Sequence, residues 1–252
     1  MDFTFVMTFP DRYEYAFQNL KAAEKYLPKN GNILVQFESE NMPLPESTKR
    51  VKWQWLPLEK INAFKKLSIK VNNKVKIREK GTDISDNNAY TDREMWRWDA
   101  FRFCHKVYAQ YHSLAHSNRY MCYIDSDVIF HKPVPEDFFY TLFEDGKYVS
   151  YINRESGPHL TPDTGYVGFD TSNPLQTEFW DEMLRLYDGG KIFEKTQGWT
   201  DCQALDHCIK HIGNSAKKLI TAEQLSWNSW KATPLSKYCT HHKGDFFKKA
   251  SA

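Results

Sequence analysis

The sequence predicts an α/β domain built around a largely parallel sheet. Strand-like apolar segments alternate with segments of helical periodicity from the start of the chain, which is the pattern of strands joined by crossover helices. The clearest strand covers residues 120–124, and it ends abruptly at Asp125 and Asp127. Ligands of open α/β sheets bind beyond the carboxyl ends of the strands. The chain of 252 residues is long enough to bury a substantial core, so this break is a candidate site in a full-sized domain.

The first half of the chain is expected to alternate strands with helices. Apolar alternation, a Pro-Asp helix start and an Asn-Gly turn mark the boundaries. The predicted elements are a strand at 3–8, a helix from Pro10 to about Tyr26, and strands at 33–37 and 51–56. Thr8, at the end of the first strand, would face the same crevice as the two aspartates.

Two segments follow before the central strand. Residues 65–80 contain seven basic residues, which predicts a solvated helix and loop, with a lid over the site as the alternative. Residues 92–114 repeat apolar side chains every three or four positions, which predicts a long amphipathic helix. Lys106, Arg97 and Arg102 lie beside its apolar stripe, and one of them could reach Asp125 or a phosphate.

The second half continues the alternation. A strand is expected at 148–152, after a short helix at 136–143, and another at 163–170. The latter contains Gly165 and Gly168, and glycines weaken a strand unless another group must approach its backbone closely. Helices are predicted after the 171–174 cap and at 199–206, where Thr200 or Asp201 is the N-cap.

Composition describes a globular protein rich in aromatic residues. Hydrophobic residues make up 41% of the chain, charged residues 26% and aromatic residues 15%. Most aromatic side chains belong in a core, although stacking on sugars is an alternative use. The net charge of +2 gives no reason to expect a nucleic-acid partner.

Cysteine usage and hydropathy bear on the compartment. The five cysteines are scattered and form no CxxC pair, which predicts a reducing environment. No basic leader precedes the first strand, and no apolar run approaches the ~18 residues of a membrane span. We therefore expect a cytoplasmic protein without a transmembrane segment, for which peripheral membrane association through a partner stays open.

Two carboxylates separated by one residue, placed after a buried strand, can both turn towards one divalent cation. Such hard oxygen ligands suit Mn²⁺ or Mg²⁺, which keep water and a diphosphate in their remaining coordination positions. The alternative is an ordinary turn, since Asp and Ser are common turn residues.

Together, four motifs resemble those of nucleotide-sugar-dependent glycosyltransferases of the GT-A fold, most nearly the glycogenin and lipopolysaccharide galactosyltransferase type. Asp125-Ser126-Asp127 resembles the family's DxD, which binds the metal and the donor diphosphate. Residues 163–168 resemble its glycine-containing strand along the donor sugar. Residues 200–206 resemble a helix start whose Asp faces the reacting sugar, although Cys202 stands where the family often has Gln. His241 or His242 with Gly244 resembles the late His-x-x-Gly.

The resemblance implies one GT-A domain over residues 1–252, a Rossmann-like mixed sheet flanked by helices. Residues 1–130 would form the nucleotide- and metal-binding half and residues 131–252 the acceptor half. The implied activity is metal-dependent transfer of a hexosyl group from a nucleotide-diphosphate sugar, with UDP as the default, to a hydroxyl of a glycan or of a lipopolysaccharide or surface polysaccharide. The implied site comprises metal ligands Asp125, Asp127 and His241 or His242; donor-binding Thr8, Ser126, Gly165 and Lys243 or Lys248; and, as catalytic carboxylate, Asp201 first and Asp163 second.

Two other classes compete with this interpretation. Asp125-x-Asp127 also nearly matches haloacid-dehalogenase-type phosphatases, in which the first aspartate is a nucleophile and the second an acid/base. Ile129 at the fifth position and the lack of a later paired-Asp motif speak against that class. A non-catalytic carbohydrate-binding protein would use exposed Trp and Tyr, but it would give the His-Lys-Gly cluster near the end of the chain no role.

Overall fold

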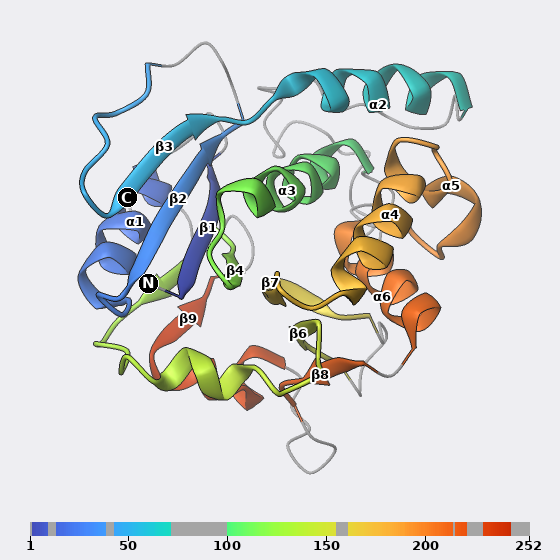
Figure 1. The fold of residues 1–252 in the computed structure, drawn as a ribbon. Coiled ribbons are helices and arrows are strands. Elements are labelled where there is room, and N and C mark those ends of the chain that lie inside the picture. Colours follow the sequence, from blue (N-terminus) through green and yellow to red (C-terminus); the bar gives the residue numbers. More distant parts are fainter. Residues whose placement is uncertain are drawn as a thin grey trace.

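The computed structural model describes residues 2–9, 14–38, 43–71, 100–154, 161–213, 215–220 and 229–242. In this part of the chain, a seven-stranded mixed sheet is flanked by helices (Figure 1). Its strands are β1 (Phe3–Phe9), β2 (Gly31–Phe37), β3 (Val51–Trp55), β4 (Tyr120–Ile124), β6 (Val149–Ile152), β7 (Asp163–Asp170) and β8 (Ala216–Lys218). The helices are α1 (Glu14–Tyr26), α2 (Leu58–Val71), α3 (Ala100–Ser113), α4 (Leu175–Tyr187), α5 (Ile192–Lys195) and α6 (Asp201–Ile212).

The strand order is β3-β2-β1-β4-β7-β6-β8. Strands β3, β2, β1 and β4 are parallel, whereas β7 runs antiparallel to both of its neighbours, β4 and β6. The predicted α/β class and the mixed sheet flanked by helices are therefore confirmed. The carboxyl ends of β1, β2 and β4 lie at one edge of the sheet, which is the edge where the sequence predicts a site.

Each face of the sheet has its own core because side chains alternate along a strand. On β1, Phe3, Phe5, Met7 and Phe9 pack into a core that includes side chains of α1. Val6 packs into the other core, with side chains of α2, α3, α4 and α6. Figure 1 shows α3, α4 and α6 together on one side, with α1 on the other. The aromatic content thus fills the core, as expected.

Several predicted boundaries shift. The helix predicted for 92–114 is observed as α3 from Ala100, and residues 92–99 lie outside the described residues, as do Pro10 and Asp11 of the first helix. The helix predicted for 136–143 is instead a 3₁₀ turn at Phe138–Leu142. The basic segment 65–80 begins within α2, and its part after Val71 is not described.

A small second sheet joins distant parts of the chain. β5 (Val128–Phe130) pairs antiparallel with β9 (Cys239–His241), so that Val128 lies opposite His241. The pairing continues past the strand ends, where the His242 N–H donates to the Asp127 carbonyl at 2.9 Å. Two 3₁₀ turns, at Ser229–Ala232 and Pro234–Lys237, lead into β9. The last described residues are thereby held against the segment that follows β4.

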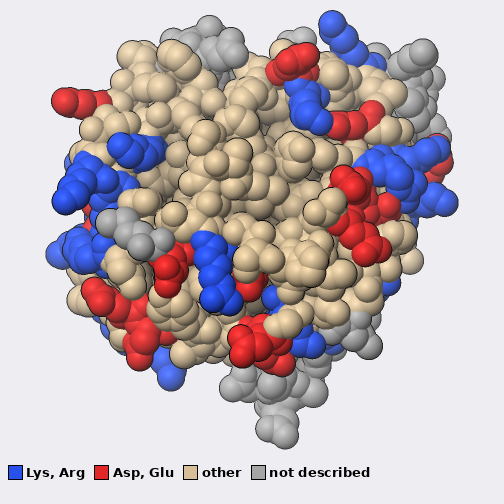
Figure 2. Space-filling view, viewed as in Figure 1, with Lys and Arg blue, Asp and Glu red and all other residues tan. Residues whose placement is uncertain are grey.

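The surface and the cysteines carry little further information. Basic and acidic side chains intermingle around the face seen in Figure 2, in keeping with the low net charge. All five cysteines are buried thiols outside any disulfide. Among the described helices, none combines the length and apolar character that crossing a membrane requires.

Candidate metal and donor site

Two carboxylates and an imidazole converge beyond the carboxyl end of β4. Asp125 follows β4 directly, Asp127 precedes β5, and His241 is the last residue of β9. The Nε2 atom of His241 lies 3.0 Å from Oδ1 of Asp127 and 3.6 Å from Oδ2 of Asp125. One possible ligand atom from each of the three residues lies within 4.8 Å of the others. Oxygen and imidazole nitrogen donors at this spacing fit a divalent cation such as Mn²⁺.

The imidazole is held from its other side. The Nδ1 atom of His241 lies 3.7 Å from Oδ1 of Asp163, and the indole of Trp230 packs against the imidazole ring at a centroid distance of 5.0 Å. Metal-binding histidines usually have a carboxylate near the second ring nitrogen, which fixes the ring orientation. His241 is also 95% covered, with a side-chain exposure of 5%, so its ring has little freedom to turn.

Gly165 on β7 leaves the space that His241 occupies. A Cβ at this position would overlap the Cε1 and Nδ1 atoms of the His241 ring. The carbonyl of Gly165 also accepts from the N–H of Asp125 at 3.0 Å. The close approach expected from the glycines of this strand is therefore present, and the approaching group is the predicted metal ligand itself.

Replacing Gly165 with alanine is expected to push the imidazole away and to weaken Mn²⁺ binding by about 10- to 100-fold, the range for changes that disturb ligand orientation. The measurement is calorimetric titration with Mn²⁺. Gly168→Ala is the matched control, because a Cβ there would meet Tyr166, Ser150 and Phe143 instead of His241. Equal Mn²⁺ affinity in Gly165→Ala and the wild type would contradict the proposed packing role.

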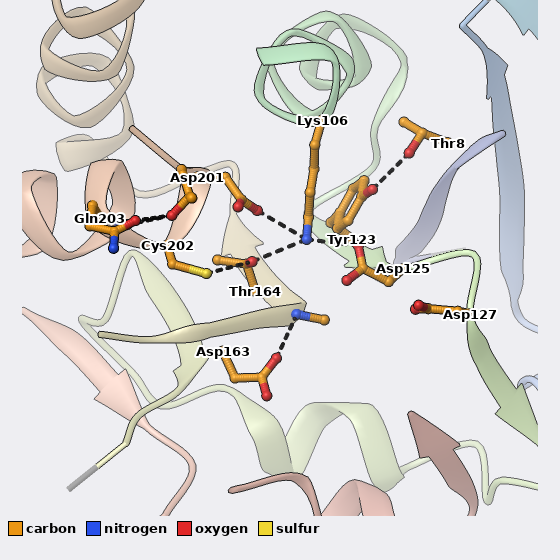
Figure 3. Close-up of polar contacts among 12 residues, drawn as sticks. Thr8, Lys106, Tyr123, Asp125, Asp127, Asp163, Thr164, Asp201, Cys202 and Gln203 are labelled. Atoms are coloured by element: carbon orange, nitrogen blue, oxygen red, sulfur yellow. Dashed lines mark hydrogen bonds and ion pairs between the residues drawn. The ribbon is translucent and has the colours of Figure 1, made fainter. Parts of the chain in front are cut away.

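Lys106 links the candidate metal cluster of Asp125, Asp127 and His241 to α6. From α3, its Nζ atom forms ion pairs with Oδ1 of Asp125 at 2.7 Å and with Oδ2 of Asp201 at 3.0 Å (Figure 3). It also donates to Oγ1 of Thr164 at 3.1 Å. Burial lowers the pKa of Lys106, but the charges of Asp125 and Asp201 outweigh it and raise this pKa well above its usual value. A permanent positive charge therefore lies next to the carboxylate cluster.

Asp201 begins α6 without capping it. Thr200 is the N-cap, and its Oγ1 accepts from the N–H of Gln203, which leaves the carboxylate of Asp201 to point at Lys106. Asp201 is 3% exposed, and within the described part of the chain its Oδ1 atom has no hydrogen-bond partner. A buried carboxylate oxygen without a donor costs free energy unless a ligand satisfies it.

Asp163 is held differently. Its Oδ1 atom accepts from the N–H of Gly165 at 3.1 Å, while Oδ2 accepts from Oγ of Ser229 at 2.9 Å and pairs with Arg154 at 3.3 Å. Asp163 is 2% exposed. A carboxylate with these fixed partners suits the orientation of His241 better than proton transfer.

Cys202 lines the same region beside Asp201. Its Sγ atom lies 3.3 Å from Oγ1 of Thr164. Burial, followed by the charge of Asp201, raises the pKa of Cys202 to about 11, so the thiol is neutral near pH 7. A neutral thiol is a poor nucleophile. Cys202 therefore contributes shape and weak polarity where the resembled family often has an amide.

The remaining predicted residues have separate positions. Oγ1 of Thr8 lies 2.8 Å from the hydroxyl of Tyr123, at the crevice edge of the sheet. The carbonyl of Ser126 accepts from Asn19 of α1, which fixes the segment between the two aspartates. The backbone of His242 binds Asp127, and its side chain is not part of the three-residue cluster. Lys243, Gly244 and Lys248 lie outside the described residues, as does Arg97.

Sequence reasoning missed some of the site. Arg154 and Ser229 contact Asp163 but were not predicted as site residues. Neither residue belongs to a recognisable motif. Lys106 was one of three basic candidates on the helix predicted for residues 92–114, and its reach to Asp125 is confirmed. Lys106 lies next to the buried apolar stripe of this helix, and that position was the sequence feature that indicated its inward reach.

No family model and no curated protein sequence matches this chain. The solved structures that match include three glycosyltransferases. One is the apo form of glycosyltransferase GlyE from Streptococcus pneumoniae TIGR4, 14% identical with a TM-score of 0.48 over 86% of this chain and 45% of that chain. Another is mouse xyloside xylosyltransferase 1 in its apo form, 11% identical with a TM-score of 0.45 over 94% of this chain and 92% of that one. A third is a glycosyltransferase involved in glycosylation of the major capsid of PBCV-1, 13% identical with a TM-score of 0.40 over 86% and 81% of the two chains. This chain thus spans less than half the length of the GlyE chain it matches.

Proposed function

We propose that the protein is a metal-dependent glycosyltransferase that uses a nucleotide-diphosphate sugar. One observation carries the proposal: β9 brings His241 to 3.0 Å from Asp127 and 3.6 Å from Asp125, although these residues lie far apart in the sequence. A turn that merely ended β4 would need neither the buried imidazole nor the glycine that makes room for it.

The cluster fits Mn²⁺ or Mg²⁺ and leaves coordination positions for a diphosphate. Asp125, Asp127 and His241 supply three ligand atoms, fewer than the six of an octahedral ion. A bound ion would supply positive charge to the diphosphate as the bond to the sugar breaks. His242 is the less suitable ligand, because its backbone rather than its side chain meets Asp127.

Lys106 and Asp201 are the residues proposed to act on the transferred sugar. The protonated Lys106 carries positive charge next to the cluster and can stabilise the leaving phosphate oxygens. Asp201 presents a buried carboxylate oxygen on the other side of Lys106, which can accept a hydrogen bond from a sugar hydroxyl or take the proton of the acceptor. Asp163 is assigned the positioning of His241.

The order of the elements along the chain suggests which part of the site would bind the donor and which the acceptor. The ends of β1, β2 and β4 would hold the nucleotide and metal, with Thr8 and Ser126 near the diphosphate. The elements after residue 130, including Gly165 on β7 and the start of α6, would line the transferred sugar and the acceptor. UDP is the default nucleotide, a glycan or surface polysaccharide the default acceptor, and the cytoplasm the default compartment. Lys243 or Lys248 would add charge at the phosphates.

The test is donor turnover. We expect Mn²⁺-dependent release of a nucleoside diphosphate from one member of a panel of UDP- and GDP-sugars, by slow hydrolysis or by transfer to added glycans, and loss of this release in EDTA. Phosphate release from simple monoesters with a trapped phosphoaspartate at Asp125 would instead establish a phosphatase. Failure of every sugar nucleotide to bind, with binding of free glycans, would favour a carbohydrate-binding protein.

A further inference from the structure

A carboxylate and an imidazole lie side by side at the carboxyl edge of the sheet, away from Asp125, Asp127 and His241. Glu38 directly follows β2, and its Oε2 atom lies 3.4 Å from Nδ1 of His105 on α3. The Glu38 side chain is 18% exposed and that of His105 10%. The imidazole also packs edge-on against Phe101 at a centroid distance of 5.2 Å, which limits its orientation. Both side chains are therefore largely buried, and each keeps some exposed surface.

This pair is not the contact that anchors β2 to α3. Gln36 lies two positions earlier and so on the same face of the strand as Glu38. Its side chain is fully buried and donates to the carbonyl of Ala109 at 2.7 Å and to the hydroxyl of Ser113. Ala109 is one helical turn from His105. The Gln36 contacts thus hold β2 against α3. Glu38 contacts the same helix two residues further on, beyond the carboxyl end of β2.

The position of Glu38 matches the nucleoside end of a donor. The metal cluster lies beyond β4, and β1 separates β4 from β2, so two strand spacings of about 4.8 Å place Glu38 about 10 Å away along the sheet edge. Tyr123 meets Thr8 through its hydroxyl and Lys106 through its ring. Thr8, at the end of β1, thus lies between the end of β2 that precedes Glu38 and the end of β4 that precedes Asp125.

We propose that Glu38, oriented by His105, binds the ribose hydroxyls of the donor nucleotide. This inference rests on the proposed function. A carboxylate can accept from both hydroxyls of a vicinal diol, and an acidic residue beyond the second strand binds a ribose hydroxyl in dinucleotide-binding α/β folds. The distance from the metal cluster suits a group that lies beyond the phosphates, and a negative charge would be unsuitable closer to them.

The test is calorimetric binding in the presence of Mn²⁺. Glu38→Gln should weaken UDP and GDP binding by about 10- to 100-fold, the equivalent of a charged hydrogen bond of about 1.5–3 kcal/mol. Its affinity for pyrophosphate, which has no ribose, should equal that of the wild type. The 2′-deoxy forms dUDP and dGDP keep one of the two hydroxyls, so the variant should lose less affinity for them than for UDP and GDP. His105→Gln should show the same pattern with a smaller loss.

The control is Glu194→Gln, which removes a surface carboxylate paired with Lys191 on α5 and should leave all affinities unchanged. Unchanged UDP and GDP affinity in Glu38→Gln would overturn the inference. Equal losses for the ribose and 2′-deoxy forms would overturn it as well, because Glu38 would then not contact the 2′-hydroxyl. A fall in pyrophosphate affinity would reveal a structural role and overturn it as well. If wild type bound neither pyrophosphate nor a nucleoside diphosphate with Mn²⁺, the proposed function itself would fail.

Discussion

Replacing Asp127 with asparagine is expected to abolish Mn²⁺-dependent stabilisation by UDP and to lower turnover by at least about 100-fold, the scale for loss of one group that stabilises developing charge. Asp127 is the carboxylate nearest Nε2 of His241. The measurement is a thermal shift with Mn²⁺ and UDP, together with donor turnover. A ligand at 100 times its dissociation constant stabilises by about 2.7 kcal/mol, so the loss is easily seen.

The unliganded Asp127→Asn protein should be at least as stable as wild type. In the absence of a metal, burial and then the neighbouring charge of Asp127 raise the pKa of Asp125, although Lys106 opposes them. Removing the Asp127 charge relieves that repulsion. Asp206→Asn is the matched control, because it breaks only a surface ion pair with Lys210 on α6. Full UDP stabilisation in Asp127→Asn would contradict the metal assignment.

Replacing Asp201 with asparagine should lower turnover by about 10²- to 10⁴-fold, the usual range for a group that transfers a proton. Binding of UDP with Mn²⁺ should stay within about threefold of wild type, a difference of less than about 0.7 kcal/mol. Asp201 lies outside the metal cluster, and asparagine preserves the shape of its side chain. The measurement is steady-state kinetics at saturating Mn²⁺, with calorimetry of UDP binding.

Asp163→Asn provides the contrast. Its carboxylate contacts Gly165, Ser229 and Arg154 and lies near His241, so the substitution should weaken Mn²⁺ binding by about 10- to 100-fold. Turnover should largely recover at saturating Mn²⁺. If Asp163→Asn stayed slow at saturating Mn²⁺ while Asp201→Asn stayed fast, the two roles would have to be exchanged.

The sheet and the aspartate pair could be predicted from local pattern alone. Apolar alternation defines β1, β2 and β3 within one or two residues, and the polar break after β4 marks Asp125 and Asp127. The glycines of β7 predicted that another group approaches this strand closely, but they did not identify His241 as that group. Thr200 and Asp201 remained alternatives as the helix cap, because either side chain can accept from a helix N–H, and packing around Lys106 decided between them.

The rest depends on contacts between distant segments. His241 and His242 differ by one residue, and only the register of β9 against β5 determines which imidazole faces the aspartates. The Glu38–His105 pair was not predicted, because it requires the packing of α3 along β2. The short helix predicted for residues 136–143 is a 3₁₀ turn at Phe138–Leu142.

The most direct test of the metal assignment is Mn²⁺ titration, with UDP present, of two adjacent histidine variants. His241→Ala should lose at least about tenfold in Mn²⁺ affinity, a change of about 1.4 kcal/mol, because it removes the imidazole ligand. His242→Ala, whose backbone contact with Asp127 survives the substitution, should bind like wild type. Wild-type Mn²⁺ affinity in His241→Ala, or a larger loss in His242→Ala, would contradict the proposed site.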